Sequence, residues 1–378
     1  FPLSTFHFPL SIFHFPFSIF NFQLLYFISL ISLIVYIALK LDNASSLPMN
    51  DSFSIYADYR KKIDEILRQS ITRKLPATLY DPLNYVLSGG GKRIRPMMVI
   101  FACEAAGGSF DEAVNASVAL EMLHNFTLVH DDIMDNAETR RSEPTVHTKW
   151  NENVAILVGD QLIGLAYIYL LKTNSGNIKE ITSAFTEGII EVCEGQSFDK
   201  EYEERKDVGI DEYMMMIRKK TAKMLETSAA VGALIGGGDE NFVSNVKEFA
   251  LNTGLAFQIQ DDLLDIIADE EEFGKKTGGD IIEGKKTYLL LKAFESAENV
   301  ADKELIKKII DNNGLKDATE SDINKVRDVY VRSGAIESAR KEIERFTKLA
   351  EDCLEQLPAN IGRERLKWLT EMLMNRSI

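Results

Sequence analysis

The chain has 378 residues, with 43 Lys and Arg against 58 Asp and Glu, so its formal net charge is −15. A composition of 45% hydrophobic and 27% charged residues excludes a disordered chain, and the acidic balance argues against a nucleic-acid-binding protein, which needs a basic face. Three scattered cysteines exclude a disulfide framework and a cysteine zinc site, and they favour a reducing, cytoplasmic setting.

Residues 1–48 differ from the rest of the chain. They hold 9 of the 21 Phe and 4 of the 9 Pro but only two charged residues, Lys40 and Asp42. A seven-residue low-complexity repeat is followed by an uncharged apolar run at 20–39, which is about long enough to cross a bilayer. Three interpretations stay open: translated DNA upstream of a start at Met49, a membrane anchor, or a targeting segment that lacks the arginines of a transit peptide. Membrane contact is expected only if this segment is genuine.

Residues 49–378 are expected to form a single all-α domain. Only five prolines occur from residue 51 onward, and long proline-free stretches carry apolar residues at spacings of three and four, the helical period. No run shows the alternation of a strand. The clearest helices are expected at 113–126, 155–171, 178–192, 213–234 and 246–267. Glycine-containing breaks are expected at 88–91, 107–108, 174–176, 236–238 and 278–279.

A glycine run precedes the first group of basic residues. The stretch GGGKRIRP at 89–96 places Lys92, Arg93 and Arg95 beside a flexible loop. It is not a nucleotide-binding P-loop, because Arg93 stands where that motif needs Ser or Thr and Val86 stands where it needs the first glycine. Three cations in so short a segment suit an anionic ligand, although any one of them is most often a solvated surface residue.

An acidic cluster of the form DDxxD occurs twice, each time after an apolar stretch. The clusters are Asp131, Asp132 and Asp135 in the first, and Asp261, Asp262 and Asp265 in the second. On a helix, residues four apart share a face, so the outer two carboxylates of each cluster point the same way and repel each other. A divalent cation relieves that repulsion, and ligands that are all oxygen indicate Mg²⁺ or Mn²⁺. A single DDxxD is usually a solvated acidic face, but two copies with apolar flanks favour metal binding.

Basic residues accompany both clusters. They are Arg140 and Arg141 after the first, Lys219 and Lys220 before Thr221, and Lys275, Lys276, Lys285 and Lys286 after the second. Mg²⁺ held by few carboxylates usually shares its coordination shell with substrate phosphates. The pattern therefore predicts a phosphate-bearing substrate.

With these motifs the sequence resembles the trans-isoprenyl diphosphate synthases, the polyprenyl synthetase family. The motifs are GGGKRIRP (89–96), HDDIMD (130–135) with TRR (139–141), GDQLIG (159–164), EGQSFD (194–199), KKTA (219–222), FQIQDDLLD (257–265) and GKKTGGDIIEGKKT (274–287). The resemblance implies the isoprenoid synthase fold, a barrel of long antiparallel helices around a central cavity, usually as a homodimer. It also implies the Mg²⁺-dependent head-to-tail condensation of isopentenyl diphosphate with an allylic diphosphate, as in isoprenoid biosynthesis.

The resemblance also implies roles for individual residues. Three Mg²⁺ ions (or Mn²⁺ as a substitute) are expected at Asp131, Asp135 and Asp261, with Asp265, Asp199, Asp132, Asp262 and Gln196 beside them. The allylic diphosphate is expected at Arg140, Lys220 and Lys275, with Thr221, Gln258 and Lys285 nearby. Isopentenyl diphosphate is expected at Lys92, Arg95, His124 and Arg141. His130 and His147 are expected to be core or capping residues.

The length of the product is expected to depend on residues one to two turns before the first cluster. Phe126, Leu123 and Thr127 occupy these positions. In the family, farnesyl-makers often have two adjacent aromatics there, whereas this chain has one, so the resemblance points to a geranylgeranyl (C20) product, with farnesyl (C15) next. An ordinary core role is the alternative for Phe126.

Other functions remain as alternatives. A terpene cyclase of similar fold is disfavoured by the second DDxxD and by GGGKRIRP, because a cyclase binds no isopentenyl diphosphate. A non-catalytic subunit of a heteromeric prenyltransferase is expected to have lost one cluster. A membrane protein is supported only by residues 1–48.

Overall fold

The computed structural model describes residues 49–268 and 277–375. From Ile55 onward the described chain belongs to one compact unit. The interpretations given for residues 1–48 fall outside the described residues and stay predictions.

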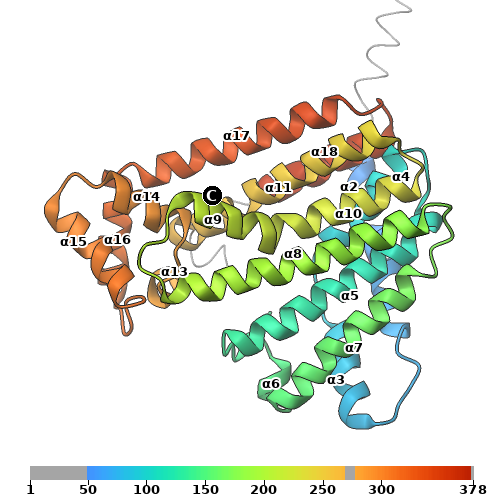
Figure 1. Cartoon of the computed structure of the whole chain (residues 1–378), viewed down its shortest axis with the longest axis horizontal. Coiled ribbons are helices and arrows are strands. Elements are labelled where there is room, and N and C mark those ends of the chain that lie inside the picture. Colours follow the sequence, from blue (N-terminus) through green and yellow to red (C-terminus); the bar gives the residue numbers. More distant parts are fainter. Residues whose placement is uncertain (1–48, 269–276, 376–378) are drawn as a thin grey trace, which may run out of the picture. The chain divides into compact units, whose positions relative to one another are not determined.

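The described chain is helical almost throughout (Figure 1). The helices of its first half are α2 (Met49–Gln69), α3 (Ala77–Ser88), α4 (Ile94–Ala105), α5 (Phe110–Met134), α6 (Val146–Lys149), α7 (Glu152–Leu170) and α8 (Ile178–Glu204). Next come α9 (Ile210–Ile217), a π-helical turn η1 (Arg218–Ala222), α10 (Lys223–Ile235) and α11 (Glu240–Ile267). The last are α13 (Gly279–Glu283), α14 (Tyr288–Ser296), α15 (Val300–Asp311), α16 (Glu320–Arg332), α17 (Ala335–Glu355) and α18 (Ile361–Met374).

The predicted all-α fold is confirmed, and the five predicted helices fall within or against α5, α7, α8, α9–α10 and α11. One difference is a small antiparallel hairpin of β1 (Thr139–Arg140) and β2 (Glu143–Pro144), too short to show a strand pattern. The other is the π-helical turn, which interrupts the predicted helix 213–234 between α9 and α10. Apolar spacing does not reveal one extra residue in a turn.

Helix α10 lies at the centre of the packing. Nearly all its side chains are buried, and it packs against α4, α8, α11 and α5. A helix that is apolar on every side is typical of such a central position. Since short connections join α10 to α11, the two are antiparallel neighbours, and α5, α8, α10 and α11 run side by side along much of their length (Figure 1).

The apolar core has two parts. One gathers around α4, α5, α7 and α10, and the other around α9, α11 and α14 to α17. Among the described helices, α7 alone is long and apolar enough to cross a membrane by length and composition, and 39% of that stretch is buried within the protein. Helix α7 packs against α5, α3 and α6.

Candidate active site

A cavity of about 1140 Å³ lies between the start of α4, α5, α8, η1 and α11. Asp131, Asp135 and Asp261 all contribute to its wall. The other predicted site residues on this wall are Lys92, Arg95, His124, Phe126, Thr127, Arg140, Arg141, Gln196, Lys220, Thr221, Gln258 and Lys285. A smaller pocket of about 280 Å³ shares several of these residues and adds Asp199, Asp262 and Asp265. Residues far apart in sequence are thus brought to one place.

Two predicted residues are placed differently, and a third is not described. Asp132 is buried beside the cavity wall, where Arg140 holds its carboxylate at 2.7 Å. Leu123 is fully buried in the core and lines neither cavity. Lys275 falls outside the described residues.

The first cluster lies at the carboxyl end of α5. The backbone N–H of Asp135 donates to the carbonyl of Asp131 at 2.8 Å, so the helical geometry carries both carboxylates to the same face. Burial raises the pKa of Asp131 to about 6; Lys220 acts against this shift, and the neighbouring Asp135 adds to it. Because the ionised form of Asp131 is costly at this position, an added positive charge nearby would stabilise its carboxylate.

The second cluster lies near the end of α11. Asp261 faces the large cavity, while Asp262 accepts hydrogen bonds from the Tyr213 hydroxyl at 2.6 Å and from Gln258 at 2.9 Å. Asp265 accepts the backbone N–H of Asp280 at 3.1 Å. Burial raises the pKa of Asp262 and that of Asp280 above their ordinary values. The charge of Asp261 adds to the pKa shift of Asp262, and the charge of Asp262 adds to the pKa shift of Asp280.

The carboxylates of the site are paired with cations of the same site. Lys200 lies 2.6 Å from Asp135, and Lys220 lies 2.5 Å from Asp199. With the side chains placed in this way, no group of three or more His, Cys, Asp or Glu within residues 49–268 and 277–375 is arranged to hold a metal ion. The chemistry of the donors nevertheless fits a hard divalent cation, because aspartate oxygens from two helices converge on one cavity.

The glycine-rich loop and the start of α4 supply the cations of another part of the wall. Arg95 reaches the cavity, and its Nη1 lies 3.2 Å from Nε2 of His124. Burial and then the cationic Arg95 lower the pKa of His124 well below its ordinary value, so the imidazole is neutral and accepts this hydrogen bond. The Nε of Arg95 is buried without a hydrogen-bond partner in the structure. Such an orphaned donor beside a cavity suits an anionic ligand.

The π-helical turn carries Lys220 and Thr221 to the cavity. The Thr221 hydroxyl donates to Gln258 at 2.8 Å, which ties the turn to α11. Gly195 of α8 lies against the turn so closely that a Cβ there would stand 2.3 Å from the backbone nitrogen of Lys220. Single π-helical turns often occur at functional sites because the extra residue redirects side chains.

The turn also separates two lysines that are neighbours in sequence. Lys219 pairs with Glu194 at 2.7 Å, outside the cavity lining, whereas Lys220 lines the cavity. Two later lysines differ less. Lys286 is buried, donates to the Glu203 carbonyl and lines only the smaller pocket, while Lys285 lines both.

The apolar part of the wall contains Phe126, whose ring meets the His130 ring edge-on at 4.8 Å between centroids. Thr127 lines the cavity beside it. His130 packs against α7, with its Nε2 3.3 Å from the Ile156 carbonyl, and His147 lies 3.2 Å from the Thr145 hydroxyl at the start of α6.

Sequence reasoning missed four polar residues that hold the site together: Glu121, Lys200, Tyr213 and Asp280. Glu121 left a signal, since it is a lone charge within the apolar stretch VALEMLHNF. The others lie in ordinary polar surroundings, and only the tertiary fold brings them to the cavity.

Comparisons with known proteins agree with this geometry. The family model for polyprenyl synthetase matches residues 76–329. The chain is 36% identical to a short chain isoprenyl diphosphate synthase of Methanothermobacter thermautotrophicus, over 87% of this chain and 99% of that protein. It is 38% identical to a geranylgeranyl diphosphate synthase of Saccharolobus solfataricus, over 79% of this chain and 90% of the relative. The crystal structure of a geranylgeranyl pyrophosphate synthetase from Pyrococcus horikoshii matches with a TM-score of 0.80 and 37% identity, covering 86% and 99% of the two chains.

Proposed function

The chain belongs to the polyprenyl synthetase family, and from this premise we propose that it is a prenyltransferase that condenses isopentenyl diphosphate head-to-tail with an allylic diphosphate. The product is a short all-trans prenyl diphosphate, geranylgeranyl diphosphate. The observation that carries this proposal is the cavity wall. It combines aspartates from two DDxxD clusters with two sets of cations that come from different elements, as two diphosphate substrates require.

We assign the metal site to the two aspartate clusters. Asp131, Asp135 and Asp261 would hold three Mg²⁺ ions, with Asp265 and Asp199 completing the shell. Bound there, the ions neutralise the diphosphate and stabilise the negative charge that develops on it as it leaves.

The allylic diphosphate lies against Arg140, Lys220 and Lys285, and Lys275 is proposed for the same role. As the bond between C1 and oxygen breaks, charge accumulates on the departing pyrophosphate, and cations aimed there stabilise the transition state more than the ground state. The double bond of isopentenyl diphosphate then bonds to C1, and a proton leaves to the released pyrophosphate. Lys92, Arg95, His124 and Arg141 hold isopentenyl diphosphate in position.

The length of the prenyl chain is limited where Phe126 lines the cavity. A phenyl ring there shortens the space available to the growing chain. Leu123, although close in sequence, is buried in the core. Several relatives are named geranylgeranyl diphosphate synthases, which supports a C20 product.

One experiment tests the whole proposal. Residues 49–378 are incubated with Mg²⁺, labelled isopentenyl diphosphate and each allylic diphosphate in turn, and the products are sized. A C20 end point is expected, a C15 end point would refute the assigned length, and the absence of elongation with every primer would refute the function. Phe126→Ala is expected to lengthen the product. Leu123→Ala is the matched control, since removing a core side chain lowers stability without widening the cavity.

We also propose that the protein is a cytoplasmic homodimer. Leu157 and Ile168 of α7 and Leu171 just after it are 57%, 54% and 62% exposed, and Ile190 of α8 is 48% exposed. A second copy is the proposed partner for this surface because α7 is partly buried in its own fold and carries the exposed Asp160 between Leu157 and Ile168. Leu157→Arg is expected to yield monomers in light scattering, and a monomeric wild-type chain would refute this assembly.

A further inference from the structure

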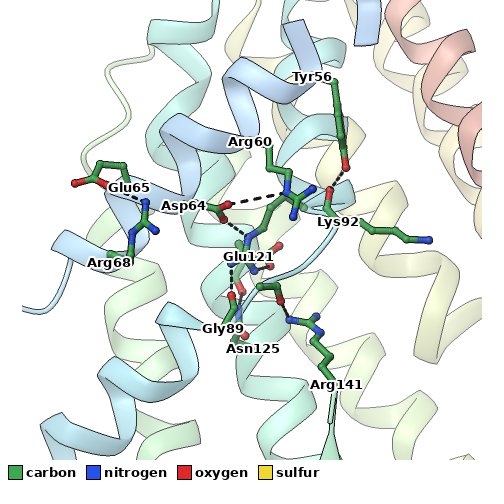
Figure 2. Close-up of polar contacts among 12 residues, drawn as sticks. Tyr56, Arg60, Asp64, Glu65, Arg68, Gly89, Lys92, Glu121, Asn125 and Arg141 are labelled. Carbon is green, nitrogen blue, oxygen red and sulfur yellow. Dashed lines mark hydrogen bonds and ion pairs between the residues drawn. The ribbon is translucent and has the colours of Figure 1, made fainter. Parts of the chain in front are cut away.

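Three backbone carbonyls of the loop Gly89–Lys92 accept hydrogen bonds from side chains of other segments. The Tyr56 hydroxyl of α2 donates to the carbonyl of Lys92, and the Arg141 guanidinium, just after β1, donates to that of Gly90. Arg93, which immediately precedes α4, turns back and donates to the carbonyl of Gly89 at 2.5 Å. Figure 2 shows Tyr56 and Arg141 reaching the loop from different sides. We call these three side chains the loop clamp.

Arg93 is the centre of the loop clamp because it is the one that is fully enclosed. Its side chain is 3% exposed, and it pairs with Glu121 of α5 at 2.6 Å and with Asp64 of α2 at 2.7 Å. Its backbone has φ of +52°, in the left-handed region that an arginine adopts only when its surroundings impose it. Arg93 therefore joins α2, α5 and the loop. Although it lines the cavity beside Lys92 and Arg95, its guanidinium is already occupied by Glu121, Asp64 and the Gly89 carbonyl.

Glu121 is the buried partner in this arrangement. Its side chain is 3% exposed, whereas Asp64 is 27% exposed. An unpaired charge at so dry a position is costly, so the Arg93–Glu121 pair fixes the distance between the loop and α5. His124, which touches Arg95, lies one turn after Glu121 on the same helix. The Arg93–Glu121 pair therefore also sets the distance between the loop and the neighbouring Arg95–His124 contact.

We propose that Glu121 is a positioning residue for isopentenyl diphosphate: through Arg93 it holds the Gly89–Lys92 loop where Lys92 and Arg95 meet the diphosphate. This rests on the proposed function. Simple electrostatics would give Glu121 the opposite effect, since a carboxylate in the wall of an anion site repels the anion.

The variant Glu121→Gln separates the two effects by their sign. If the carboxylate only repels the substrate, its loss tightens binding of isopentenyl diphosphate. If it positions the loop, the KM for isopentenyl diphosphate rises about ten- to a hundred-fold, the effect expected of a displacement near 1 Å. The KM for the allylic diphosphate, held by Arg140, Lys220 and Lys285, stays within about twofold because these residues do not contact Glu121.

A second ion pair supplies a matched control. Glu104, at the end of α4, pairs with Arg365 at 2.6 Å and accepts a hydrogen bond from Tyr59 at 2.8 Å. It lies ten residues along α4 from Ile94, about 15 Å away, and it lines none of the pockets described above. Glu104→Gln is therefore expected to lower the melting temperature while leaving both KM values unchanged.

Tyr56→Phe keeps the inference testable if Glu121→Gln does not fold. It removes one donor of the loop clamp and keeps the ring that packs on Trp368 at 5.4 Å between centroids. A several-fold rise in the KM for isopentenyl diphosphate alone is expected, and an unchanged KM would overturn the proposal.

Calorimetry with isopentenyl diphosphate distinguishes failure of the positioning role from failure of the proposed function. If the wild-type chain transfers no prenyl group, the proposed function is refuted. If Glu121→Gln binds isopentenyl diphosphate as tightly as the wild type, or more tightly, the positioning role is refuted. Weaker binding by the variant supports it.

Discussion

Replacing Gly195 with alanine tests whether the close approach of α8 to the π-helical turn positions the allylic diphosphate. A Cβ at Gly195 would stand 2.3 Å from the Lys220 nitrogen and 2.7 Å from its Cα. Ordinary contacts between such atoms are about 3.5 Å or longer, so α8 or the turn must move by about 1 Å. The atoms in the way are backbone, which cannot rotate aside as a side chain can.

The size of the expected effect follows from that displacement. Overpacking of this kind costs about 1–3 kcal/mol of stability, and a shift near 1 Å in a group that binds substrate lowers the rate about a hundred-fold. We therefore expect kcat/KM for the allylic diphosphate to fall by that factor in Gly195→Ala, measured by incorporation of labelled isopentenyl diphosphate well below the melting temperature.

Gly188→Ala is the matched control on the same helix. Gly188 lies seven residues earlier, hence about two turns away on the same face, and its Cβ would meet the Thr227 hydroxyl at 2.5 Å. Thr227 belongs to α10 and lines neither cavity. This variant is expected to lose no more stability than Gly195→Ala, because its new Cβ meets a side chain rather than backbone, and to keep near-normal turnover. Normal kcat/KM in Gly195→Ala, or an equal loss in both variants, would refute the reasoning.

Three further predictions concern single side chains. Lys200→Met removes the cation that pairs with Asp135 and competes with a metal ion for it. The Mg²⁺ concentration that gives half of the maximal rise in melting temperature is therefore expected to fall about two- to five-fold, the range of a half-exposed ion pair. An unchanged or higher concentration would contradict this. Cys193 is exposed in the cavity lining, whereas burial raises the pKa of Cys103 to about 12. A thiol reagent is therefore expected to modify Cys193 first and more slowly when pyrophosphate and Mg²⁺ are present, and labelling of Cys103 first in mass spectrometry would contradict it. His124 has a folded-state pKa well below its ordinary 6.5, so the unfolded chain takes up its proton first and stability is lost as the pH falls below 6.5. Relative to His124→Gln, the wild type is expected to lose about 1 kcal/mol of unfolding free energy between pH 6.5 and 5.5 in urea titrations, and a constant difference would refute it.

The sequence alone was enough to predict the fold class and most of the charged residues that line the cavity, though not Glu121 or Lys200. Helical spacing identified α5, α8 and α11, and the DDxxD pattern identified Asp131 and Asp261, because both signals are local and repeat along the chain. What a charge does once buried is not local. Arg93 and Lys92 are adjacent in one basic motif and both line the cavity, yet the Arg93 guanidinium is occupied by carboxylates of two helices, Asp64 and Glu121.

The π-helical turn shows the same limit at the level of the backbone. The extra residue separates Lys219 from Lys220, and the turn packs against Gly195 of α8 and Gly254 of α11, whose added Cβ would meet Ala222 at 2.6 Å. These contacts join residues far apart in sequence, and a glycine inside a helix indicates only that something comes close, without saying what. Leu123 and Phe126 are separated for a similar reason, since only helix packing decides which of them faces the cavity.

The charges of the cavity indicate how a protein of net charge −15 accepts polyanionic substrates. Asp135 and Asp199 are paired with Lys200 and Lys220. A metal ion competes with these lysines for the carboxylates, and a diphosphate competes with the carboxylates for the lysines. Either ligand alone leaves one member of each pair without its partner in a partly buried place, which is unfavourable. Both together leave every charge paired. Metal and diphosphate therefore favour each other's binding, and the acidic residues that repel the free substrate become the means of holding it once the metal is present.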